Sequence, residues 1–198
     1  MGRRLLERLR TTLGVSAWTF VGVSAGGALG LTYAAMFGSS LSGLVLASCR
    51  ASIPANSEDG TIYDPALPRH PALLSALRRV NADRLNSRDE RRLIWPLLAE
   101  RVEVVSEMLD RGVSINADRR RAFLRQRADL FPSMSSIAVP TLMLHGRHDP
   151  SVPLREAIAI AAALPSGSLQ VLEDCGHFPF AEEPVLCKGA LRAFLANL

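Results

Sequence analysis

Residues 11–49 form one long apolar run whose character changes along its length. No charged residue occurs between Thr11 and Cys49. The run is rich in β-branched and aromatic residues over 17–23, in alanine, glycine and leucine over 25–37, and again in β-type residues over 43–48. A parallel strand that is covered on both faces has an unbroken apolar sequence. We therefore predict a strand, a helix and a second strand over these three ranges.

A hydropathy scan alone could interpret the same run as a membrane anchor, because Arg3, Arg4, Arg8 and Arg10 precede it. Seven glycines interrupt the run, however. Together with the change of character, they favour a buried strand–helix–strand unit. The preceding residues 3–13 place Leu5, Leu9 and Leu13 on one helical face, and Gly14 follows. This spacing predicts an amphipathic surface helix.

Beyond residue 50 the sequence becomes charged and is interrupted by prolines. Ser87 and Glu90 have capping-box spacing and predict a helix start, and Pro96 should interrupt that helix. Gly112 should end the next helix, and residues 117–130 predict another. After residue 136 we predict strands over 139–146 and 168–173, a helix over 154–164, and a last helix that begins near Pro184.

Strands that alternate with helices predict a parallel sheet with helices on its faces, which is an α/β fold. Because the helical stretch separates two of the predicted strands, we expect it to be an insertion. Residues 1–50 and 137–198 should form the α/β core, and residues 51–136 the inserted helices.

Composition narrows the function classes only slightly. The chain of 198 residues carries a net charge of +4, but its arginines are mixed with acids and its aromatic residues are sparse. Neither a nucleic-acid partner nor a membrane span is expected. The three cysteines have no paired spacing, which favours a reducing, cytoplasmic location. No metal-ligand cluster and no phosphate-binding glycine loop is present, so we expect no metal and no other cofactor.

The candidate chemistry begins at a G-x-S-x-G pattern, residues 22–26, between the first predicted strand and helix. There a serine sits on a sharp turn that exposes its hydroxyl, and glycines on both sides let neighbouring chain approach. Ser24 is therefore the candidate nucleophile. The N–H of Ala25, at the start of the helix, would point toward a developing oxyanion.

A serine needs a base, and the base needs an acid to orient it. Of the four histidines, His177 follows the last predicted strand in a loop, where parallel sheets place ligands. His70 is predicted at the surface, His145 at a strand end, and His148 beside the acid. Asp149 follows the third predicted strand and is the candidate acid, although an aspartate before a proline can also serve only as a turn residue.

Three segments in this order, residues 22–27, 137–153 and 175–184, resemble successive motifs of the α/β-hydrolase superfamily. The resemblance implies Ser24 as nucleophile, Asp149 as acid, His177 as base, and residues 51–136 as a helical cap over the site. It begins at the fifth strand of the family, so strands five to eight are expected here. The four preceding strands, and the loop that supplies a second oxyanion-hole donor, are not found before Ser24.

Two expectations follow from that difference. Loss of one oxyanion donor should impair turnover by about 10²–10³-fold. The strand before Ser24 should be an exposed edge, which predicts self-association or a partner.

We expect a hydrolase that cleaves an ester or related acyl bond in a small molecule through an acyl-enzyme on Ser24. The alternatives are a truncated, weakly active or non-catalytic homologue that acts as a binding or interaction protein, and an acyltransferase or lyase of the same superfamily.

Overall fold

The computed structural model describes residues 2–51, 61, 64–68, 70–82, 87–110 and 129–198. Its centre is a parallel sheet of four strands in the order β1 (Trp18–Val23), β2 (Leu41–Ala47), β3 (Thr141–Gly146) and β4 (Gly167–Leu172). Val23 pairs with Ala47, Ala47 with Leu144, and Gly146 with Leu172. The carboxyl ends of all four strands therefore meet at one edge of the sheet, and the predicted α/β fold is confirmed.

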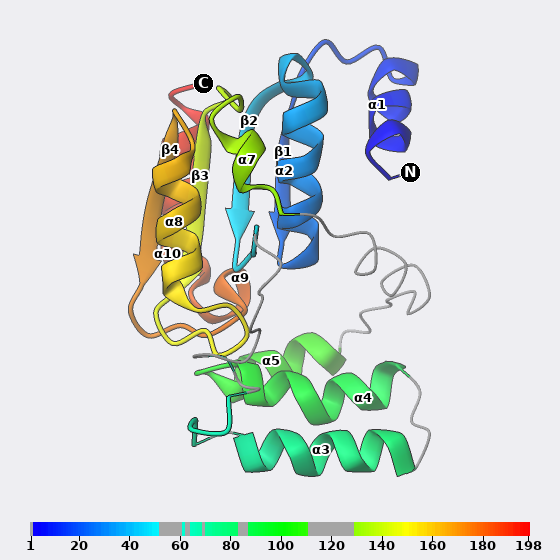
Figure 1. Ribbon diagram of the computed structural model, residues 1–198, viewed down its shortest axis with the longest axis vertical. Coiled ribbons are helices and arrows are strands. Elements are labelled where there is room, and N and C mark those ends of the chain that lie inside the picture. Colours follow the sequence, from blue (N-terminus) through cyan, green and yellow to red (C-terminus); the bar gives the residue numbers. More distant parts are fainter. Residues whose placement is uncertain (1, 52–60, 62–63, 69, 83–86, 111–128) are drawn as a thin grey trace.

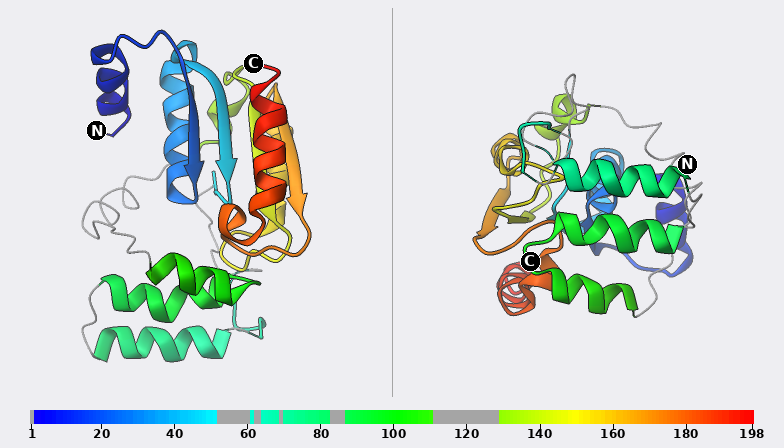
Figure 2. Two further views of the ribbon diagram at one scale, coloured as in Figure 1. Left: turned by 180° about the vertical axis from the view of Figure 1, so that it is seen from behind. Right: turned by 90° about the horizontal axis from the view of Figure 1, so that it is seen from below.

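Helices cover both faces of this sheet (Figures 1 and 2). On one face lie α2 (Ala25–Phe37), α7 (Phe131–Met134) and α8 (Leu154–Ala163), and on the other lies α10 (Pro184–Leu195). Leu44 and Leu46 belong to the core on the α2 side, whereas Val45 and Ala47 belong to the core on the α10 side. Because both faces of β2 are buried, its sequence is apolar at nearly every position.

A group of helices lies beyond the carboxyl ends of the strands (Figure 1). It consists of α3 (His70–Ala82), α4 (Ser87–Ile94), the 3₁₀ turn η2 (Trp95–Leu98) and α5 (Val102–Asp110). Its small apolar cores include Leu73 and Val105, and Phe178 from the sheet side packs against them. The ring centroids of Trp95 and Phe178 are 5.2 Å apart. This contact joins the helical group to the loop that follows β4.

The predicted elements agree closely with the observed ones. The first predicted helix corresponds to α1 (Gly2–Thr12), and α4 begins at Ser87 and ends just before the turn that contains Pro96. Helix α3 was not predicted individually within the helical stretch 51–136. Nor were the short elements η1 (Gly38–Ser40), α7 and α9 (Pro179–Glu182), because single turns have no periodicity to detect. Gly112 and nearly all of the helix predicted over 117–130 fall outside the described residues.

Helix α1 does not bury its apolar face, as an amphipathic surface helix usually does. Its leucines Leu5 and Leu9, and Leu13 directly after the helix, are 48–63% exposed. Instead, Glu7 accepts hydrogen bonds from the Tyr33 hydroxyl (2.6 Å) and the Arg10 guanidinium (2.5 Å). The Arg10 hydrogen bond, followed by that of Tyr33, lowers the pKa of Glu7 to about 2. A charged hydrogen-bond network therefore attaches α1 to α2.

Strand β1 lies at the edge of the sheet and pairs, among the described strands, with β2 alone. Val21 and Val23 on this strand are 49% and 40% exposed. The expected exposed edge is therefore present in this structure. Within the described ranges, no helix is long and apolar enough to span a membrane.

Candidate functional site

Ser24 forms the sharp turn between β1 and α2. Its φ of 52° and ψ of −117° lie in a region that costs a residue with a side chain about 1–3 kcal/mol. The surrounding structure holds the turn, since the Ser24 N–H donates to the Ala47 carbonyl (2.8 Å) and the Ser24 carbonyl accepts from the Gly27 N–H (3.0 Å). The strain is therefore local and is supported by the neighbouring strand and helix.

The glycines around Ser24 do not share one role. A Cβ on Gly22 would lie 2.4 Å from the Gly26 carbonyl oxygen, and a Cβ on Gly27 would lie 2.4 Å from the Cys49 Cβ. A Cβ on Gly26, by contrast, would meet no heavy atom of the described residues within 4 Å. The expectation that glycines on both sides of Ser24 permit close approach is therefore right for Gly22 and wrong for Gly26.

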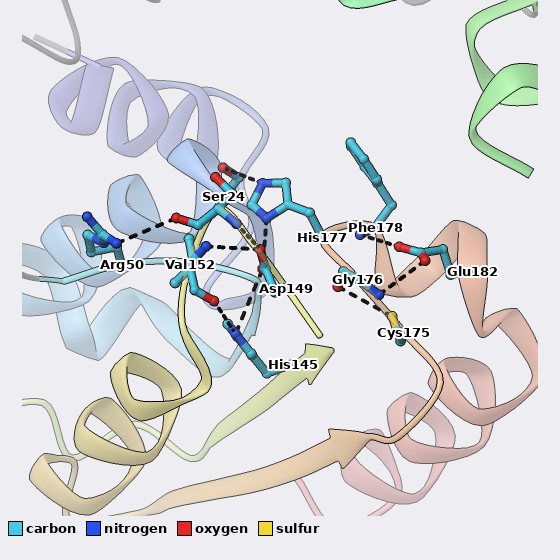
Figure 3. A network of polar contacts seen from close by, with 11 residues as sticks. Ser24, Arg50, His145, Asp149, Val152, Cys175, Gly176, His177, Phe178 and Glu182 are labelled. Carbon is cyan, nitrogen blue, oxygen red and sulfur yellow. Dashed lines mark hydrogen bonds and ion pairs between the residues drawn. The ribbon is translucent and has the colours of Figure 1, made fainter. Parts of the chain in front are cut away.

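The three residues singled out in the sequence come together at the carboxyl edge of the sheet (Figure 3). Asp149 lies in the loop after β3 and His177 in the loop after β4. The His177 Nδ1–H donates to Asp149 Oδ2 over 2.8 Å, and His177 Nε2 lies 3.2 Å from Ser24 Oγ. Because Nδ1 carries the proton in this arrangement, the lone pair of a neutral His177 at Nε2 faces the serine hydroxyl.

The Asp149 carboxylate is buried but well supplied with donors. Its Oδ1 accepts the N–H groups of Ser151 (2.8 Å) and Val152 (2.9 Å), which leaves Oδ2 for His177. Burial alone would raise the pKa of Asp149, but the charge and hydrogen bond of His177 outweigh it, and the pKa lies below its usual value. Asp149 is therefore ionised at neutral pH and stabilises a protonated His177.

The other histidines have different surroundings. His145 is fully buried at the end of β3, and its Nε2–H donates to the Val152 carbonyl (2.9 Å), whereas its Nδ1 has no partner among the described residues. Burial lowers the pKa of His145, so this ring is neutral. His148 is exposed, and His70 is half-buried at the first residue of α3. None of these three contacts Ser24 in the described structure.

Comparison with known proteins shows the family of this chain. The sequence model of the alpha/beta hydrolase fold family matches residues 3–184. The chain belongs to the α/β-hydrolase fold family. An α/β-fold hydrolase from Bacillus anthracis superposes with a TM-score of 0.83 at 26% identity, over 97% of this chain and 72% of that one.

Two curated relatives are more distant or shorter matches. Monoacylglycerol lipase abhd6-A of Xenopus laevis is 23% identical over an alignment of 184 residues that covers 82% of this chain and 55% of the relative. The putative carbamate hydrolase RutD of Pseudomonas syringae is 36% identical over 78 residues, or 39% of this chain and 30% of the relative. This α/β-hydrolase chain thus spans about half the length, or less, of these two curated relatives.

In this α/β-hydrolase, Ala25 is the first residue of α2, directly after Ser24. The first N–H groups of a helix have no partner within the helix, and the helix dipole makes that end positive. Ala25 is thus placed where its N–H can face an anionic oxygen formed next to Ser24 Oγ.

The cysteines offer no competing nucleophile. All three are buried, and none forms a disulfide with another described residue. Burial raises the pKa of Cys175 far above its usual value and that of Cys187 to about 11. Thiols with such a raised pKa are not thiolates at neutral pH. Among the described residues, no group of three or more His, Cys, Asp or Glu side chains is arranged to hold a metal ion.

One residue that sequence reasoning passed over is Glu182. Its side chain is fully buried, and its carboxylate accepts hydrogen bonds from main-chain N–H groups on both sides of His177. The only signal in the sequence is an acid that directly follows the apolar stretch 178–181, five residues after His177. That signal does not distinguish a buried carboxylate from a solvated one.

Proposed function

We propose that this α/β-hydrolase is a serine hydrolase, with Ser24 as nucleophile, His177 as general base and Asp149 as the acid that orients it. The observation that carries the proposal is the continuous series of hydrogen bonds from Ser24 Oγ through the His177 ring to Asp149. A serine hydroxyl becomes an effective nucleophile only when a positioned base takes its proton.

The reaction then follows from the geometry. His177 Nε2 takes the Ser24 Oγ proton while Oγ attacks the acyl carbon, and the negative oxygen formed faces the Ala25 N–H. The bond to the leaving group breaks as Nε2 returns the proton to it, which leaves Ser24 esterified by the acyl group. Water then attacks the acyl carbon of this ester and gives a proton to Nε2. The bond to Oγ breaks as Nε2 passes that proton to Oγ, which releases the acid and restores the Ser24 hydroxyl.

Two further observations support a cap over the site and a small-molecule substrate. The helices α3, α4 and α5 lie beyond the strand ends where Ser24 is found, which supports the cap proposed within residues 51–136 over a core made of residues 1–50 and 137–198 (Figure 1). The end of that range belongs with the core instead, because Leu130 and Met134 of the α7 region pack in the core on the α2 side. The relatives include a monoacylglycerol lipase and a putative carbamate hydrolase, which supports a small molecule with an ester or related acyl bond as substrate.

The direct test uses small activated esters and a fluorophosphonate probe. Wild type should hydrolyse the ester and become labelled at Ser24, whereas Ser24→Ala should do neither. Ser42→Ala, which removes an exposed hydroxyl on β2, is the matched control and should behave as wild type. Equal rates for wild type and Ser24→Ala would refute the proposal, and a folded chain that takes no label would support a non-catalytic interaction protein.

The same assay separates hydrolysis from acyl transfer. With an added alcohol or thiol acceptor, a hydrolase still releases the free acid, whereas an acyltransferase forms the new ester or thioester. With Ala25 as the one oxyanion donor assigned, we expect turnover about 10²–10³-fold below that of a site with two donors.

We also propose a cytoplasmic location, because Cys175 and Cys187 are buried thiols that form no disulfide with another described residue. Self-association through the exposed edge of β1 belongs to the same proposal. Sedimentation of the 198-residue chain at increasing concentration tests it, and a monomer at every concentration would contradict it.

A further inference from the structure

The last residue of α9, Glu182, is a fully buried carboxylate within five residues of His177. Glutamate is almost never fully buried unless its charge is satisfied by partners. Here the partners are peptide N–H groups from two separate parts of the chain. Their identity suggests a role beyond stability.

The first pair of donors stands on either side of His177. The Gly176 N–H donates to Glu182 Oε2 over 3.1 Å, and the Phe178 N–H donates to Oε1 over 2.9 Å (Figure 3). The two peptide groups that flank His177 are thereby tied to one rigid carboxylate. Any rotation of the His177 main chain, and hence of its ring relative to Ser24, must break one of these bonds.

The second pair of donors comes from the short segment between η2 and α5, in the helical group. Glu182 Oε2 also accepts the N–H groups of Glu100 (2.7 Å) and Arg101 (3.0 Å). The Arg101 guanidinium donates to the Glu182 carbonyl (2.7 Å). The carboxylate therefore connects the helical group to the His177 loop.

Main-chain contacts also join the His177 loop directly to residues 98–101. The His177 N–H donates to the Leu98 carbonyl (2.9 Å). A Cβ on Gly176 would lie 2.5 Å from that same carbonyl oxygen, so only glycine permits this approach. The main chain of His177 is thus held from the helical group on one side and from Glu182 on the other.

We propose that Glu182 is a positioning residue, which holds His177 in line with Ser24 and makes that alignment depend on the docking of residues 98–101. The inference rests on the proposed serine hydrolase function. An amide could not replace the carboxylate, because Gln keeps one acceptor oxygen and presents an NH₂ group to the remaining N–H donors. The negative charge also strengthens each of the four bonds.

The test compares Glu182→Gln with Glu183→Gln, which removes the same charge at the next residue. Glu183 is the matched control, and its Oε1 lies 3.9 Å from the Arg101 Nη1. We expect Glu182→Gln to lower the rate of fluorophosphonate labelling and kcat by about 10–100-fold, since a misplacement near 1 Å costs as much as 10²-fold. KM should change little, and Glu183→Gln should label at the wild-type rate.

A merely structural role would lower the melting temperature and leave kcat per labelled site unchanged, and that result would overturn the proposal. Two further readouts report on the alignment directly. In Glu182→Gln, the downfield proton resonance of the His177–Asp149 hydrogen bond should weaken. Hydrogen exchange should also accelerate at Gly176 and Phe178 together with Glu100.

If Glu182→Gln fails to fold, Arg101→Ala decides the question. It removes a half-exposed guanidinium and leaves the carboxylate in place. Exchange should then accelerate at Gly176 and Phe178 as well as at Glu100, and acceleration at Glu100 alone would overturn the proposal. Exchange and the resonance need no catalysis, so loss of the serine hydrolase proposal, seen as an unlabelled wild type, is distinguishable from loss of this one.

Discussion

The two glycines that flank the pattern around Ser24 give a sharp test of the local structure, because the structure assigns them opposite tolerances. In Gly22→Ala the new methyl group would lie 2.4 Å from the Gly26 carbonyl oxygen and 2.7 Å from the Gly27 nitrogen. Both are main-chain atoms, which cannot rotate away. In Gly26→Ala the methyl group would meet no heavy atom of the described residues within 4 Å.

The magnitudes follow from these contacts. Overpacking of this kind costs about 1–3 kcal/mol. For a chain of this length, 1 kcal/mol shifts the melting temperature by about 2–4 °C, so Gly22→Ala should melt about 2–12 °C below wild type. Gly26 is the second residue of α2, and in a helix interior alanine is favoured over glycine by about 0.5–1 kcal/mol, so Gly26→Ala should melt at, or up to about 4 °C above, the wild-type temperature.

Thermal unfolding followed by circular dichroism measures the melting temperatures. The fluorophosphonate labelling rate measures the reactivity of Ser24. Gly22→Ala should also label more slowly, by up to about 10²-fold, because relief of the clash must move the turn that holds Ser24. Gly26→Ala should keep most of its labelling rate. The reasoning is refuted if Gly22→Ala matches wild type in both assays, or if Gly26→Ala loses as much stability as Gly22→Ala.

Three further predictions concern charge and burial. Asp149→Asn should lower ester hydrolysis by about 10⁴-fold, because an amide does not hold the base in the required tautomer; a loss below tenfold would contradict the assigned role. Because the folded-state pKa of Glu7 is lowered to about 2 from 4.5, its contribution to stability is complete above pH 4.5 and is lost as the pH falls through 2. The difference in melting temperature between wild type and Glu7→Gln should therefore be present at pH 7 and vanish near pH 2, and a constant difference would argue against the network. Iodoacetamide should alkylate Cys175 and Cys187 only after unfolding, as measured by mass spectrometry, because burial raises the pKa of both thiols; rapid alkylation of the folded chain would contradict their burial.

The sequence determined the features that depend on near neighbours in the chain. The apolar run through β2 predicted a strand buried on both faces, and the observed α2 has the predicted bounds because it lies between the turn at Ser24 and Gly38. The order of the three motifs predicted the family. Asp149 and His177 could be chosen because parallel strands bring the loops at their carboxyl ends to one edge.

Only the tertiary structure decided features that depend on what approaches from elsewhere in the chain. The sequence does not distinguish Gly22 from Gly26, because the clash depends on how α2 folds back over the turn. It does not indicate that the leucine face of α1 lies outward, since the bond between Glu7 and Tyr33 spans 26 positions. Nor does it show that Glu182 meets donors 81 and 82 positions away, because contact between distant segments is a property of packing and not of local pattern.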